Sequence, residues 1–213
     1  MPSMDVSASS LRDPSDPLEL RHAATDRATI VLVPERRLLA IDGVGTPASG
    51  AFRLASETLR QVGNELRTRL HQARGLDTRV GILECAWWIH PEVAPHALAD
   101  AFVDRTSWHW QQMLEIPSRT SDDEAEAAIE VTRQGAGREV PLVRLIHFVE
   151  GRAAQILHLG GVATEPDAVR RLVAAVTEAG VHPRGHLHEL YLADPAQVPV
   201  SRARTILRLP IED

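Results

Sequence analysis

The stretches GILECAWWIHPEV (residues 81–93) and GHLHELYLADPAQV (185–198) hold the same place in two successive series of predicted elements. The first follows LLAIDGVGTP (38–47) and a predicted helix, and the second follows QILHLGGVAT (155–164) and another predicted helix. One more strand-like stretch comes after each of the two quoted stretches, 81–93 and 185–198. A strand–helix–strand–strand unit therefore occurs twice, at a spacing of about 105 residues, which is too long for a solenoid repeat and indicates two fused halves.

The two halves are expected to cover residues 27–118 and 119–213 approximately, within a single domain over 26–213. Their sheets would meet either edge to edge or face to face, and a cleft at such a junction is a common ligand position. Residues 1–25 are rich in Ser, Pro and Asp, which predicts a flexible leader.

Apolar periodicity and capping signals predict three helices, over residues 49–75, 121–134 and 164–180. Ser121 is followed three residues later by Glu124, which is a capping-box pattern. Gly75 and Gly180 stand where the first and third helices should end.

Two regions are predicted to contain paired β-rich runs. Residues 28–45 hold two such runs with Pro34 between them. Residues 140–161 read as two strands joined at Glu150–Gly151–Arg152, which predicts a hairpin.

The composition is that of an ordinary globular protein, with 44% hydrophobic and 24% charged residues among 213. The net charge of −6 and the absence of basic runs argue against a nucleic-acid partner. No apolar run approaches the roughly 20 residues that a membrane span needs. Cys85 has no second cysteine to pair with, and no signal-peptide pattern is present, so a cytoplasmic location is expected.

Glu189 and Tyr191 are the first candidate site residues. Side chains alternate along a strand, so these two share one face, while His186, His188 and Leu190 share the other. A carboxylate on the inward face of a sheet is costly unless function requires it. Apolar walls would raise its proton affinity and suit it to accept a proton from water; a solvent-exposed strand-edge glutamate is the alternative.

Four tryptophans in two close pairs are the second candidates. Trp108 and Trp110 share a face, whereas Trp87 and Trp88 point in opposite directions. Core filling would explain the pairs, but tryptophan faces also attract flat or electron-poor ligands.

Two alignments of the halves remain open and decide which member of the first pair faces the cleft. Aligning the glycine that precedes each strand turns Trp87 toward the ligand. Aligning Glu84 with Glu189 turns Glu84 and Trp88 toward it instead, and this second alignment is preferred.

A metal site and a cysteine nucleophile are both disfavoured. His186 and His188 share a strand face, but that face is opposite Glu189 and the spacing fixes no third ligand. Cys85 has no identifiable base beside it and is expected to be a buried apolar residue. Neither a metal nor a cofactor is expected.

Six stretches in order resemble the GyrI-like small-molecule-binding family. They are LLAIDGVGTP, LECAWW, WHWQQMLEIP, AQILHLGG, GHLHELYLADP and TILRLP, and together they extend from about residue 33 to residue 210. The resemblance implies an α+β fold, a tandem pseudo-two-fold repeat of β-α-β-β units with a ligand cleft between the repeats. One departure is Val162, which stands where the family often has a tyrosine.

The resemblance also implies a function. Stand-alone members of similar length open the cyclopropane ring of duocarmycin- and yatakemycin-type DNA alkylators by adding water, within an aromatic cage. Glu189 and Tyr191 match the family's glutamate and tyrosine, and Trp87 and Trp88 match its tryptophan pair. The expected partner is therefore a bulky aromatic small molecule, handled without a cofactor. Sequestration of bulky aromatic or cationic xenobiotics without chemistry, or ligand sensing beside a transcription regulator, are the alternatives; the oligomeric state is left open.

Overall fold

A single antiparallel sheet of eight strands dominates the computed structural model, which describes residues 23–89, 97–101, 104–193 and 198–212. Most of the expected leader, residues 1–25, lies outside these ranges. The strand order in the sheet is β1-β6-β8-β7-β3-β4-β2-β5. The strands are β1 (Thr29–Val33), β2 (Arg36–Val44), β3 (Leu83–Trp88), β4 (His109–Glu115), β5 (Arg144–Phe148), β6 (Gly151–Leu159), β7 (Leu187–Tyr191) and β8 (Arg204–Pro210).

The helices of the described residues begin and end close to the predicted positions. They are α2 (Gly50–Arg74), α3 (Leu98–Ala101), α4 (Asp122–Gly135) and α5 (Glu165–Glu178), with the 3-10 turns η2 (Val162–Thr164) and η3 (Val200–Arg202). Ser121 and Glu124 cap α4 reciprocally, which confirms the capping box. Gly75 ends α2 in the left-handed conformation, with φ of 64°, where only glycine is unstrained.

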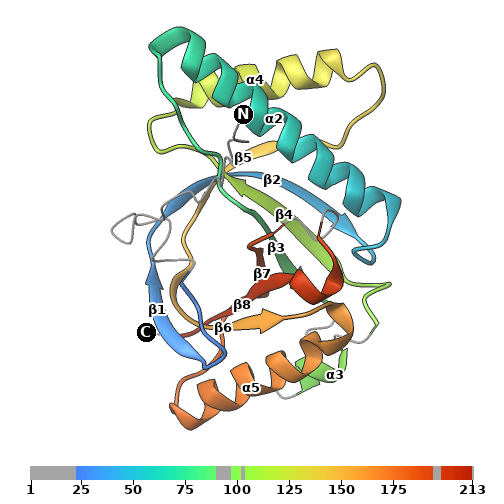
Figure 1. The fold of residues 1–213 in the computed structure, drawn as a ribbon, viewed down its shortest axis with the longest axis vertical. Coiled ribbons are helices and arrows are strands. Elements are labelled where there is room, and N and C mark those ends of the chain that lie inside the picture. Colours follow the sequence, from blue (N-terminus) through green and yellow to red (C-terminus); the bar gives the residue numbers. More distant parts are fainter. Residues whose placement is uncertain (1–22, 90–96, 102–103, 194–197, 213) are drawn as a thin grey trace, which may run out of the picture.

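The two halves meet edge to edge, because β3 of the first half pairs with β7 of the second at the centre of the sheet. The unit β2-α2-β3-β4 lies on one side of this junction and β6-α5-β7-β8 on the other. In Figure 1 the curved sheet runs between α2 and α4 at one end and α5 and α3 at the other. The α+β fold with a tandem pseudo-two-fold repeat is thus confirmed.

The predicted hairpin at Glu150–Gly151–Arg152 is wrong, although both of its strands exist. β5 pairs with β2, whereas β6 pairs with β1 and β8, so β5 and β6 lie far apart in the strand order. Only Val149 and Glu150 connect them, and only Pro34 and Glu35 connect β1 to β2. Because each residue spans at most about 3.6 Å, these short links require the sheet to curl into a half-barrel whose two edges approach each other.

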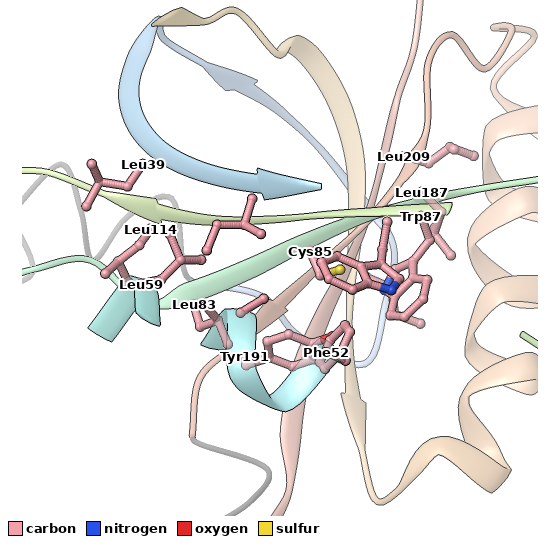
Figure 2. Packing of buried hydrophobic residues seen from close by; sticks show 14 of the residues in the cluster. Leu39, Phe52, Leu59, Leu83, Cys85, Trp87, Leu114, Leu187, Tyr191 and Leu209 are labelled. Carbon is pink, nitrogen blue, oxygen red and sulfur yellow. The ribbon is translucent and has the colours of Figure 1, made fainter. Parts of the chain in front are cut away.

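Alternation along the strands gives this sheet two distinct faces. The face covered by α2 and α5, here called the helix face, carries Cys85, Trp87, Trp110, Leu187, Glu189 and Tyr191. The opposite face, here called the inner face, carries Glu84, Ala86, Trp88, His188, Leu190 and Arg208. Figure 2 shows Phe52 of α2 gathered with Cys85, Trp87 and Tyr191 in the main core, on the helix face.

Candidate active site

A cavity of about 340 Å³ opens on the helix face between the two halves of the molecule. One wall is the side of α2 that presents Phe52, Ser56 and Arg60, which lie four residues apart and therefore on one helical face. The opposite wall comes from the end of β6 and the start of α5. The full lining is Pro47, Phe52, Arg53, Ser56, Glu57, Arg60, Leu83, Gly160, Gly161, Val162, Glu165, Glu189, Tyr191, Ala203 and Thr205.

Two donors fix the carboxylate of Glu189, which lines this cavity. The hydroxyl of Tyr191 donates to its Oε2 at 2.6 Å, across two residues of the same strand. Nη1 of Arg105 donates to its Oε1 at 2.7 Å. Glu189 is 1% exposed, so these two charge-assisted or short hydrogen bonds replace most of the hydration that burial removes. Glu189 and Tyr191 are thus brought together as the strand alternation predicts.

Arg105 extends this arrangement to a second carboxyl group. Its Nη2 donates to Oε2 of Glu165 at 2.5 Å, and its guanidinium lies 4.8 Å from the centre of the Trp87 ring. Burial, followed by the negative charge of Glu189, raises the pKa of Glu165 to about 8. Burial and the charge of Glu189 also raise the pKa of Tyr191 well above its ordinary value, so its hydroxyl stays protonated and remains a donor.

The tryptophans do not form the predicted cage. Trp87, Trp108 and Trp110 are each at most 1% exposed and are absent from the cavity lining given by the described residues. Instead, the Trp87 ring stacks on Phe52 at 5.4 Å and Trp110 meets Phe52 edge-on at 5.2 Å. The two indoles therefore support Phe52, which with Tyr191 supplies the aromatic lining.

The preferred alignment that turned Glu84 and Trp88 toward the cleft is also wrong. Cys85 lies directly opposite Glu189 in the sheet, so Glu84 and Trp88 point to the inner face. A one-residue shift of alignment moves every side chain to the other face. The alternative, with Trp87 on the face of Glu189, agrees with the observed pairing.

On the inner face, Glu84 belongs to a buried ionic network. It pairs with Arg36 at 2.6 Å, while Glu150 binds Arg36, Arg208 and His188 at 3.3, 2.9 and 2.9 Å. Burial would lower the pKa of His188, but the charges of Glu150 and Glu84 outweigh it and raise that pKa. The opposite charges of this network compensate one another in the buried interior of the inner face.

Trp88 lines a separate inner-face cavity of about 250 Å³. There its ring stacks on the imidazoles of His186 and His109, at 4.7 and 5.7 Å between ring centres. It is therefore separated from the Glu189 cavity by the thickness of the sheet.

The remaining sequence candidates are the histidines and Cys85. Among the described residues, no cluster of three or more His, Cys, Asp or Glu side chains has the arrangement of a metal site. Cys85 is buried and its thiol pKa is raised by burial and then by Glu189, so it stays protonated and is a poor nucleophile.

Sequence reasoning missed Arg105, Glu165 and Phe52. Glu165 reads as an ordinary acidic residue in the first turn of a helix, and Arg105 stands in a loop with no motif around it. Phe52 is one member of an apolar helical stripe. Only the tertiary arrangement identifies them, because it places α5 and the loop that precedes β4 beside β7.

Several solved structures share this architecture. An uncharacterized conserved protein from Listeria innocua is 26% identical with a TM-score of 0.80, and a hydrolase from Listeria innocua is 25% identical with a TM-score of 0.75. Both alignments cover 91% of this chain and 96% of the other. The C-terminal domain of EcmrR is 11% identical with a TM-score of 0.54, covering 88% of this chain and 98% of that one. No protein-family model and no curated protein matches the sequence.

Together the sheet, the paired helices and the cavity between the halves define a GyrI-like fold with a cleft between its two halves. The similarity to the two Listeria innocua proteins extends over nearly the whole length of their solved chains. Within the ranges that the structure describes, none of the helices has the length and apolar character needed to span a membrane.

Proposed function

We propose that this protein is a cofactor-independent hydrolase that opens the cyclopropane ring of duocarmycin- and yatakemycin-type DNA alkylators by adding water, which would protect or detoxify the cell. One observation carries the proposal: the fixed carboxylate of Glu189 lines a largely apolar cavity between α2 and α5. The hydrolase from Listeria innocua that shares the fold supports hydrolytic chemistry in this cavity.

The cavity offers what such a reaction requires. The ring of Phe52 and the apolar side chains Leu83 and Val162 provide a surface for a flat guest. Glu189 would accept a proton from a water molecule as the water oxygen bonds to the cyclopropane methylene. Tyr191 and Arg105 hold the carboxylate in place, so little reorganisation is needed at the moment of reaction.

Substituting Glu189→Gln tests the proposal. The amide keeps the size of the side chain and an oxygen for Arg105, but it cannot take a proton from water. We expect turnover to fall by about 10²–10⁴-fold, while the affinity for the alkylator changes little. The water adduct would be quantified by mass spectrometry and binding by quenching of tryptophan fluorescence.

Glu178→Gln is a matched control, because Glu178 is exposed at the far end of α5. It should behave like the wild type in both assays. Undiminished turnover by Glu189→Gln would contradict the assigned role. If the wild type binds the compounds and returns them unchanged, the protein sequesters its ligands without chemistry.

A further inference from the structure

Two carboxyl groups in the cavity share one cation. Nη1 and Nη2 of Arg105 bind Glu189 and Glu165 at 2.7 and 2.5 Å, and all three side chains are at most 4% exposed. A guanidinium does not lose its proton at any ordinary pH, so the trio carries at most one positive and two negative charges. If both carboxyl groups were ionised, one of the two negative charges would lack a compensating positive charge, which is strongly disfavoured in a buried site. The pair of carboxyl groups should therefore retain one proton near neutral pH.

The hydrogen bonds indicate which carboxyl group holds that proton. Glu189 receives two donors, from Arg105 and Tyr191, and donors favour the ionised form. Glu165 receives only the donor from Arg105 among the residues that the structure describes. The raised pKa of Glu165 agrees with this assignment. Glu165 is thus the acid and Glu189 the base, side by side on one guanidinium and both lining the same cavity.

We propose that Glu165 is a catalytic acid that donates its proton to the substrate oxygen on which negative charge develops as Glu189 activates water. This inference rests on the proposed function and narrows its substrate class to cyclopropanes conjugated with a carbonyl group. Pairs of groups whose environments separate their pKa values commonly divide the acid and base roles in this way.

The step balances without a cofactor. The water oxygen bonds to the ring methylene, and Glu189 takes a proton from that water. The cyclopropane carbon–carbon bond breaks, and its electron pair moves through the conjugated ring to the carbonyl oxygen. Glu165 protonates this oxygen, which yields a phenol. Transfer of a proton from Glu189 back to Glu165 through water restores the starting state.

Two measurements on Glu165→Gln test the inference. The first is the infrared carbonyl band of a protonated carboxyl group near pH 7, in the protein without substrate. We expect the wild type and Glu178→Gln to show this band and Glu165→Gln to lack it. Persistence of the band in Glu165→Gln would overturn the assignment of the proton, whether or not the protein turns over any substrate.

The second measurement is the dependence of kcat on pH. Wild-type kcat should fall above about pH 8 as Glu165 loses its proton. Glu165→Gln should be about 10–100-fold slower at pH 7 and should lose that alkaline limb, Glu165→Asp should retain it, and Glu178→Gln should match the wild type. An unchanged rate and profile in Glu165→Gln would overturn the acid role while leaving the hydrolase proposal intact. Absence of turnover in the wild type would instead reject the hydrolase proposal and the acid role with it.

Discussion

Single residues decide the chemistry of the cavity. The proton that Glu165 retains near neutral pH also makes the free energy of unfolding depend on pH. The pKa of Glu165 is raised from 4.5 to about 8 in the folded protein, so folding takes up a proton between these values. The free energy of unfolding therefore falls as pH rises through this window and levels off above it. Below pH 4.5 the proton is bound in both states and its contribution to stability is fully present.

Glu165→Gln should remove this pH dependence, because glutamine stays neutral and still offers an oxygen to Arg105. Relative to the wild type, the variant should gain at least about 1 kcal/mol of stability between pH 5 and pH 8.5. Urea unfolding at the two pH values measures the difference. Parallel pH profiles of stability for the two proteins would show that Glu165 is ionised throughout.

At this scale the sequence predicted only part of the site. The shared face of Glu189 and Tyr191 was predictable because alternation along one strand is local information. Which faces Trp87 and Trp88 occupy depended on how two distant strands were aligned. The alignment of Glu84 with Glu189 gave the wrong face, whereas the alignment of the preceding glycines agrees with the observed pairing. Arg105 and Glu165 come from separate segments whose meeting no local pattern encodes.

At the scale of elements, the junction of β2 and β4 shows how a buried aromatic constrains its neighbour. Gly43 lies directly opposite Trp110, and a Cβ atom on Gly43 would lie 2.1 Å from Cζ2 of the indole. Trp110 in turn packs against Phe52, which lines the cavity. The absence of a side chain at residue 43 therefore allows the indole to lie across the strand and support the cavity wall.

Gly43→Ala should accordingly destabilise the protein by about 1–3 kcal/mol through overpacking. Gly50→Ala is the matched control, since nothing lies within 4 Å of a Cβ at that position, at the start of α2. Urea midpoints of the two variants provide the comparison, with the control at or above the wild type. Equal stability of Gly43→Ala and the wild type would mean that the indole is free to move.

The positions of the helices and strands were predicted better than the pairing of the strands. Helix caps and breakers are local, so α2, α4 and α5 appear where Ser121, Gly75 and Gly180 indicate. The supposed hairpin failed because adjacency in sequence does not fix pairing in a sheet that curls. Glu150, placed in a turn by its neighbours, instead belongs to the buried network of the inner face.

At the scale of the whole molecule, the halves are interlocked. β1 precedes the first unit but pairs with β6 of the second, and β5 precedes the second unit but pairs with β2 of the first. Arg36 and Glu150, beside the two short links, form an ion pair that also crosses between halves. The duplication was predictable from the order of motifs, but this exchange of strands was not.

The exchange predicts that the halves cannot fold separately. Fragments 1–118 and 119–213 should each lack cooperative unfolding by circular dichroism and should form a folded complex when coexpressed. A chain cut by a protease at a site inserted between Ser118 and Arg119, which are exposed, should stay assembled after folding. Cooperative unfolding of either fragment alone would refute this expectation.

The exchange of β1 and β5 between the halves also limits how a ligand can reach the cavity. Many two-lobed proteins admit ligands by swinging their lobes apart about a hinge. Here such a motion would separate β3 from β7 and stretch the two-residue links that join β1 to β2 and β5 to β6. We therefore expect the frame to stay closed and the long side chains at the mouth, Arg53, Glu57 and Arg60 of α2, to move aside instead. Admission would then depend on the opening between these polar side chains, so that a flat aromatic ligand enters more readily than a globular one of the same size.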